Sequence, residues 1–121
     1  VKEQLFTLFG LVSDKVVYLD EKQREHLHLS AVLSNNFTNY LYTISKEILD
    51  ENDIDFSILT GLISQSAKQI ENVSPEKSQT GPAMRNESKV IEKHLKLLEN
   101  KPEYYNLYKF VSESIIKKYH G

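Results

Sequence analysis

The chain has 121 residues, of which 40% are apolar and 26% are charged. This is the size of one domain, and the composition supports a hydrophobic core rather than a disordered chain. The net charge of −2 argues against a nucleic-acid-binding domain, which needs a basic patch. Because there is no cysteine, disulfides and thiolate zinc sites are excluded. The lack of cysteine and of a recognisable signal peptide leads us to expect a cytoplasmic protein.

Residues 1–19 are expected to form a short helix and then one short strand. Apolar residues recur over positions 5–12, and the run Lys15–Leu19 is β-branched and bounded by turn-like residues. A single strand cannot form a sheet, so it needs a partner from another chain or from sequence outside this one. The chain also opens at Val1 within an apolar-periodic stretch, which indicates a fragment of a longer protein.

One long helix is predicted from Glu21 to Asn52, a stretch without Gly or Pro. Asp20 followed by Gln23 has the pattern of an N-terminal capping box. The segment from His26 to Ser45 carries no formal charge, and as a helix it would be about 30 Å long, enough to cross a bilayer. Its two His and three Asn argue against a membrane span, so we expect a central helix surrounded by others. Its apolar stripe comprises Leu29, Leu33, Phe37, Tyr40, Leu41, Ile44 and Ile48.

Three further helices follow, which makes the predicted fold an all-α helical bundle around the long helix. The first runs from Phe56 to Val73 after an Asp55 cap, and Ser74-Pro75 ends it. After a loop over Ser78–Asn86, a helix is expected over Glu87–Glu99 with Asn86 as its cap. The last helix begins at Lys101-Pro102, with the proline in the first turn. The inward residues of these helices are expected to be Leu59, Leu62, Ile63, Ile70, Val73, Val90, Ile91, His94, Leu95, Leu98, Tyr104, Tyr108, Val111, Ile115 and Tyr119.

Neutral polar residues gather on one face of the long helix. At about 100° per residue, this face carries His28, Asn35, Asn36, Asn39 and Thr43 beside Val32. One interpretation is a hydrogen-bonded helix crossing or an ordinary half-buried face. The other is the wall of a ligand cleft, in which His28 exchanges a proton and the Asn amides orient a substrate.

A second candidate is the loop Thr80-Gly81-Pro82-Ala83-Met84-Arg85. Gly permits a close backbone approach, Pro fixes the path of the chain, and Arg85 could hold a carboxylate or phosphate through two hydrogen bonds. The alternative is a structural loop whose Arg85 pairs with a helix. The loop lacks the glycine pattern of a phosphate-binding loop.

The four histidines do not have metal-ligand spacing, so we predict no metal site. An inward His94 is more often a hydrogen-bonded core residue than a ligand. The aromatic residues of the last helix have the spacing of core packing, although Tyr hydroxyls at a rim would also suit a subunit interface. No catalytic triad, carboxylate pair or phosphate loop is recognised, so a self-contained catalyst is not expected.

The helix segment His28-Leu29-Ser30-Ala31-Val32-Leu33-Ser34-Asn35-Asn36-Phe37, the loop Thr80–Arg85 and the pair His94-Leu95 occur in this order. Together they resemble the C-terminal helical domain, a domain of unknown function, of bacterial two-domain proteins assigned as NADP oxidoreductases. That domain belongs to the broad class of 6-phosphogluconate dehydrogenase C-terminal-like domains. The resemblance covers roughly residues 15–119.

The resemblance implies that residues 1–19 are the remnant of a preceding Rossmann-like domain and that residues 20–121 are the helical domain. NADP would bind mainly to that absent domain, so none is expected on this chain alone. His28 and Asn36 match family positions in the cleft, Asn39 lies on the same face, and Thr80, Gly81, Pro82 and Arg85 would form the opposite wall. That His28 is the catalytic acid or base is our hypothesis. His94 also matches the family, without an implied role. Domains of this class commonly form dimers through their long helices, so the resemblance implies a homodimer.

Two departures limit what the resemblance implies. The family loop commonly continues Arg-Gly-Asp, whereas this chain reads Arg85-Asn86-Glu87, which keeps the acid and loses the glycine. Related dehydrogenases use a Lys and an Asn on the equivalent helix, and here there is no Lys between Lys22 and Lys46. The Lys-dependent mechanism is therefore not implied.

We accordingly expect a substrate-side and dimerisation domain of an NADP-dependent oxidoreductase, with an unknown small-molecule substrate and no activity of its own. The first alternative is a non-catalytic helical interaction module. The second is a small nucleic-acid-binding domain, which the net charge disfavours. The sequence does not identify a substrate.

Overall fold

The computed structural model of the protein describes residues 18–121, and none of these residues lies in a β-strand. The predicted all-α class is therefore confirmed for this part of the chain. The helix and strand expected over residues 1–19 lie outside the described residues, apart from Tyr18 and Leu19, which are irregular.

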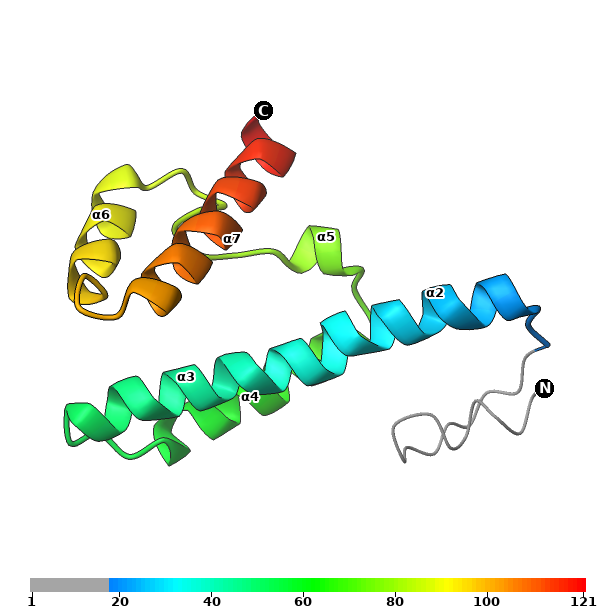
Figure 1. Cartoon of the computed structure of the whole chain (residues 1–121), viewed down its shortest axis with the longest axis horizontal. Coiled ribbons are helices and arrows are strands. Elements are labelled where there is room, and N and C mark those ends of the chain that lie inside the picture. The colour runs from blue at the N-terminus through cyan, green and yellow to red at the C-terminus, as the bar shows by residue number, and fades with distance from the viewer. Residues whose placement is uncertain (1–17) are drawn as a thin grey trace. The chain divides into compact units, whose positions relative to one another are not determined.

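The predicted long helix is confirmed as one continuous rod made of three segments (Figure 1). These are α2 (Glu21–Ala31), the π-helical segment η2 (Val32–Asn36) and α3 (Phe37–Glu51). The capping box at its start is also confirmed. The Gln23 backbone N–H donates to Asp20 Oδ1 at 2.8 Å, and the Asp20 N–H donates to Gln23 Oε1 at 3.0 Å.

The π-helical segment was not predicted. It is defined by hydrogen bonds that span five residues, such as that from the Phe37 N–H to the Val32 carbonyl. The Thr38 hydroxyl adds a bond of 3.4 Å to the Leu33 carbonyl. Within the described part of the chain, none of its five residues is buried.

A Schellman motif ends α3. The Ile54 N–H donates to the Leu49 carbonyl at 2.9 Å and the Asp53 N–H donates to the Asp50 carbonyl at 3.3 Å, as this motif requires. Asp53 takes the left-handed position with φ 57°, where glycine is the usual residue. No glycine marks this turn in the sequence.

The chain divides after Ile54 into two compact units, and the second comprises Asp55–Gly121. Each unit is described by itself. The first unit contains the long helix, and the second contains helices α4 to α7.

Helix α4 (Ser57–Gln69) is shorter than the predicted helix over Phe56–Val73. Asp55 does accept a hydrogen bond of 2.8 Å from the Ser57 N–H, although Phe56 occupies the cap position. The inward face predicted for this helix is only partly right, because Leu62 is 60% exposed and Ile70 is 58% exposed. A single turn, α5 (Pro75–Ser78), then begins where only a helix end was predicted. Pro75 is the reason, since proline both stops a helix before it and suits the first turn of the next.

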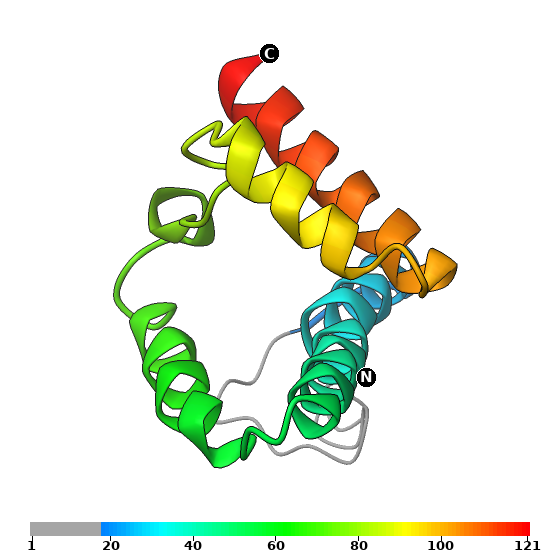
Figure 2. The ribbon, with the colours of Figure 1, turned by 90° about the vertical axis from the view of Figure 1, so that its left-hand side faces the viewer.

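Helices α6 (Ser88–Leu97) and α7 (Pro102–His120) lie side by side as a helical hairpin (Figure 2). Proline at the start of α7 is confirmed. Leu98 is buried in the turn between the two helices, and Ser112 is buried on α7. The predicted inward residues of the hairpin are half-buried or buried, except Val111, which is 42% exposed.

Most of the apolar stripe on the long helix is exposed. Ile44 is buried and Ile48 is half-buried, whereas the rest of the stripe is between 44% and 58% exposed: Leu29, Leu33, Phe37, Tyr40 and Leu41. Among the described residues, only the last turns of the predicted stripe are buried or half-buried. Among the described residues, no helix is both long and apolar enough to cross a membrane.

Candidate functional site

The polar residues predicted for the cleft lie in three consecutive segments of the long helix. His28 is in the last turn of α2, Asn36 ends η2 and Asn39 is in the first turn of α3. All three side chains are exposed. They are therefore accessible in the first unit, which a ligand-binding residue requires.

The π-helical segment changes which of these residues lie in line. In a regular α-helix, the eight residues from His28 to Asn36 would leave the two side chains about 80° apart around the axis. A turn closed by five-residue hydrogen bonds holds more residues than an α-turn, so each residue advances by less than 100°. The π turn therefore brings the Asn36 side chain back toward the side of the helix on which His28 lies. We call the surface that carries these two residues the polar line. Asn39 lies about 60° away from Asn36, because three α-helical residues fall short of a full turn.

The predicted loop Thr80–Arg85 is a compact series of turns in the second unit. The Arg85 N–H donates to the Gly81 carbonyl at 3.1 Å, and the Glu87 N–H donates to the Pro82 carbonyl at 2.8 Å. Gly81 has φ 102°, a conformation that residues with a side chain rarely adopt, so the glycine is required for the path of the loop. Ala83 is buried beneath these turns.

The side chain of Arg85 is engaged at the start of α6. Its Nε lies 2.9 Å from Glu87 Oε1 in an ion pair that is open to solvent. From the other end of the unit, His120 Nε2 donates to the Met84 carbonyl at 2.6 Å. These contacts agree with the alternative in which the loop is structural and Arg85 forms an ion pair near a helix. They do not test whether Arg85 also binds an anion, which stays a prediction.

Asn86 occupies the position of the glycine that the family loop commonly has. The expected role of Asn86 as a helix cap is wrong, because Glu87 precedes α6 and no side chain caps this helix. Instead Asn86 adopts φ 54°, the left-handed conformation. Asn is among the few residues other than glycine that tolerate this conformation, so the tight turn is retained despite the lost glycine.

His94 is a structural residue of the α6–α7 hairpin, as the first interpretation had it. Its Nδ1 lies 2.6 Å from the Tyr108 hydroxyl oxygen, and the two rings meet edge to face at 5.5 Å between centroids. Burial raises the pKa of Tyr108 above its usual range, while a hydrogen bond with the Ser112 hydroxyl acts in the opposite direction. These three side chains form a polar cluster between the two helices. Tyr108 was predicted only as a member of an inward stripe, since its partner is fourteen positions away.

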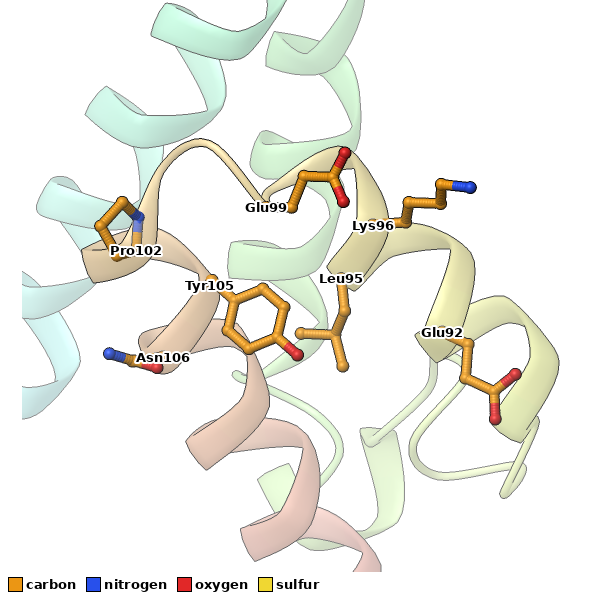
Figure 3. A pocket seen from close by; sticks show the side chains of 7 residues that line it. All are labelled: Glu92, Leu95, Lys96, Glu99, Pro102, Tyr105 and Asn106. Carbon is orange, nitrogen blue, oxygen red and sulfur yellow. The ribbon is translucent and has the colours of Figure 1, made fainter.

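Two hollows in the second unit were not predicted. The first, of about 530 Å³, lies at the end of the α6–α7 hairpin where the connecting turn joins the two helices, and Figure 3 shows the Tyr105 ring and Leu95 facing each other within it. The Lys96 and Glu92 side chains point away from it. The second, of about 470 Å³, lies between α5 and α7 and includes the exposed Phe110. None of the residues predicted for the site lines either hollow.

Glu76 and Tyr119 connect α5 to α7 beside the second hollow. The Tyr119 hydroxyl donates to the Glu76 carbonyl at 3.1 Å. Its own backbone N–H lowers the pKa of the Glu76 carboxyl most, and the nearby Ser74 hydroxyl and Lys118 act in the same direction. Within residues 18–121, no three His, Asp or Glu side chains come together in a way that could hold a metal ion. The prediction of no metal site stays a prediction for the whole protein.

Comparisons with known proteins agree with the resemblance found in the sequence. The chain is similar to a crystal structure from Bacteroides fragilis that bears the name "putative NADP oxidoreductase", with a TM-score of 0.82 and 37% sequence identity. The match covers 88% of this chain and 41% of that protein, so this chain spans less than half its length. The comparison with curated proteins gives no match. A family model described as "Domain of unknown function (DUF2520)" matches residues 1–115. The chain therefore belongs to the DUF2520 family, a family of domains of unknown function.

Proposed function

We propose that this chain is the substrate-side and dimerisation domain of a two-domain, NADP-dependent oxidoreductase. The observation that carries the proposal is the close structural match to one part of a longer protein named as an NADP oxidoreductase. A dinucleotide-binding domain outside this chain would hold the cofactor. We therefore expect the chain alone to bind little NADP and to have no activity, and we expect the whole protein in the cytoplasm.

The exposed apolar stripe supports the dimerisation role. Leu29, Leu33 and Phe37 are each more than half exposed, and Tyr40 and Leu41 continue the same face. A soluble protein rarely leaves such a patch uncovered, and patches of this kind usually bind another surface. A second copy would supply an identical stripe, so two long helices could pack against each other around a two-fold axis.

The mass of the chain in solution tests this contact directly. Light scattering during gel filtration should give about 28 kDa, twice the 14.0 kDa of one chain. Leu33→Gln should shift the mass toward that of one chain, because it places an amide in the contact. Ile58→Gln is the matched control, since Ile58 is 70% exposed on α4 and lies outside the long helix. A wild-type mass of one chain, or equal effects of the two substitutions, would contradict the proposed contact.

The polar line of the long helix supports the substrate-side role. His28 and Asn36 are exposed, lie in line and combine an imidazole with an amide. We propose that His28 exchanges a proton with the substrate and that Asn36 and Asn39 orient it. Arg85, with Thr80, Gly81 and Pro82, is a separate candidate surface for an anionic group of the substrate.

The substrate role is tested in the full-length protein by following NADPH consumption with a set of small carbonyl compounds. With a compound that is reduced, His28→Gln should lower kcat at least about a hundredfold, the usual range for loss of an acid or base. The affinity for NADPH should not change. His26→Gln is the matched control, because His26 is also an exposed histidine of α2, with its Nδ1 2.8 Å from the Lys22 carbonyl oxygen. Full turnover in the His28 variant would refute this role.

The alternative function is a non-catalytic interaction module. The exposed apolar surface supports this alternative equally well, because the surface requires a partner but not a reaction. A full-length protein that dimerises but neither binds NADPH nor consumes it with any compound would favour the alternative.

A further inference from the structure

The peptide unit between Met84 and Arg85 is held at both of its polar groups. Its carbonyl oxygen, on Met84, lies 2.6 Å from Nε2 of His120 in the last turn of α7. Its N–H, on Arg85, donates to the Gly81 carbonyl at 3.1 Å. Because a peptide unit is planar, these two bonds together fix the orientation of the plane that contains the Arg85 Cα.

The bond from His120 extends a series of acceptors in the loop. The carbonyls of residues 81–83 accept backbone N–H groups from residues 85–87. The next carbonyl, on Met84, accepts an imidazole N–H from a residue 36 positions away. A carbonyl can only accept, so this bond requires the form of His120 that carries a proton on Nε2. Helix α7 thus supplies to the loop a bond that holds the residue directly before Arg85.

The side chain of Arg85 is accessible to a ligand. It is 58% exposed, and its ion pair with Glu87 uses Nε. The Nη atoms carry further N–H donors in fixed directions, which suits the recognition of an oxyanion. A long side chain loses conformational freedom when it binds a ligand, so a backbone that is already fixed lowers the total cost of binding.

We propose that His120 is a positioning residue for Arg85. Through the Met84 carbonyl, it fixes the backbone from which Arg85 reaches the oxyanion of a carboxylate or phosphate group. This role rests on the proposed function, in which the loop Thr80–Arg85 binds an anionic group of the substrate.

The neighbouring residue on α7 holds a different segment. The Tyr119 hydroxyl donates to the Glu76 carbonyl in α5 at 3.1 Å, whereas His120 bonds to the loop. Successive residues of an α-helix point about 100° apart, so one turn of α7 reaches both segments. The two hydrogen bonds can therefore be removed separately, and Tyr119 provides a matched control for His120.

Hydrogen exchange of the Arg85 amide tests the positioning without a ligand. His120→Leu removes the donor from an exposed position in the last turn, so the circular dichroism should not change. The Arg85 amide should exchange about three- to tenfold faster, the range for the loss of one hydrogen bond. His120→Gln should restore slow exchange, because its amide N–H can donate to the same carbonyl. Tyr119→Phe should leave the Arg85 amide as in the wild type.

The affinity for anions tests what the positioning does. Inorganic phosphate and, in a separate titration, acetate are added to the chain, and the chemical shift of the amide at position 85 reports binding. For the anion that binds more tightly, the dissociation constant should rise at least about threefold in His120→Leu and return in His120→Gln. Arg85→Gln should abolish this binding. A preference for one of the two anions distinguishes a phosphate group from a carboxylate.

The outcomes distinguish the positioning role from the proposed function. Unchanged exchange of the Arg85 amide in His120→Leu overturns the positioning role and leaves the anion-binding surface standing. Faster exchange with unchanged anion affinity also overturns it, because the fixed backbone then does not matter for binding. A wild type that binds neither anion, or binding that survives Arg85→Gln, overturns the anion-binding surface and, with it, the positioning role. Faster exchange and weaker binding in His120→Leu, both restored in His120→Gln, support both.

Discussion

His94 and Tyr108 join α6 to α7 through a hydrogen bond of 2.6 Å between Nδ1 and the phenolic oxygen. Both side chains are half-buried, and the buried Ser112 lies next to them in the same polar cluster. Few residues of this unit are buried, so a single hydrogen bond between the two helices contributes a large part of what fixes their packing.

Tyr108→Phe should lower the free energy of unfolding by about 1–2 kcal/mol, because a half-buried His94 nitrogen loses its partner while the packing of the ring is kept. Chemical denaturation followed by circular dichroism measures this difference. Tyr105→Phe removes a hydroxyl from the same helix on the face of the first hollow. If the two variants lose equal stability, the hydrogen bond is not the cause.

Alkaline pH should weaken the same contact. Burial raises the pKa of Tyr108 above the ordinary value of 10.0, so the unfolded chain releases this proton at a lower pH than the folded chain. The contribution of Tyr108 is therefore fully present below about pH 10 and is lost as the pH rises through the folded pKa. Stability measured from pH 9 to about pH 11 should fall less steeply in Tyr108→Phe than in the wild type. Parallel curves would show that the group does not contribute.

Asn86→Val should destabilise the second unit by about 1–2 kcal/mol, because a β-branched residue is forced into the left-handed conformation at φ 54°. Asn86→Gly should be neutral or slightly stabilising, since glycine adopts this conformation without steric cost. Thermal unfolding of the two variants gives the comparison. Lys89→Val on α6 is the control for introducing valine in a regular helix, with an expected cost of about 0.5 kcal/mol. A valine at position 86 that costs no more than this would contradict the strained turn.

Asp53→Gly should stabilise the end of α3 by a few tenths of a kcal/mol, up to about 1 kcal/mol. Asp53 has φ 57° in the Schellman motif, and both hydrogen bonds of the motif come from backbone groups that the substitution keeps. Asn52→Gly, one position earlier with φ −115°, is the matched control and should not stabilise. Hydrogen exchange of the Ile54 amide reports the motif itself, and its protection should rise in the Asp53 variant only.

Acid should weaken the first turn of α5 through the Glu76 carboxyl. Its pKa is lowered from the ordinary value of 4.5, mostly by its own backbone N–H and also by the nearby Ser74 hydroxyl and by Lys118. A carboxyl with a lowered folded pKa contributes stability above the unfolded value, and that contribution is lost as the pH falls through the folded pKa. Glu76→Gln should therefore reduce the loss of stability between about pH 5 and pH 3, by a small amount because the group is exposed. Glu71→Gln, outside this turn, is the control, and an equal effect there would refute the role of Glu76.

Local signals were enough to predict the helices and several of their ends. The capping box of Asp20 and Gln23 and the proline at the start of α7 act within one turn, so the sequence alone shows them. The apolar stripes and the proline and glycine breaks defined the helical elements for the same reason. The family motifs around His28, Thr80–Arg85 and His94 also lie in short segments, and the family match over residues 1–115 agrees with them.

Other features depend on contacts or backbone choices that no local pattern specifies. The hydrogen bond of His94 needed a partner fourteen positions away, and the bond from His120 to Met84 spans thirty-six positions. From the sequence, Asn86 could be a helix cap or a left-handed turn residue. Its short polar side chain suits the first role, and its tolerance of positive φ suits the second. The surrounding turns decided between them. The π turn was invisible for a similar reason: its residues are ordinary helix residues, and only the hydrogen bonds that they make distinguish five-residue spacing from four. The sequence by itself thus determined which segments are helical and which residues are candidates, since those depend on neighbours within a turn or two. The tertiary structure alone decided the partners, the rotation of one surface relative to another and the exposure of the stripe, because those depend on where distant parts of the chain lie.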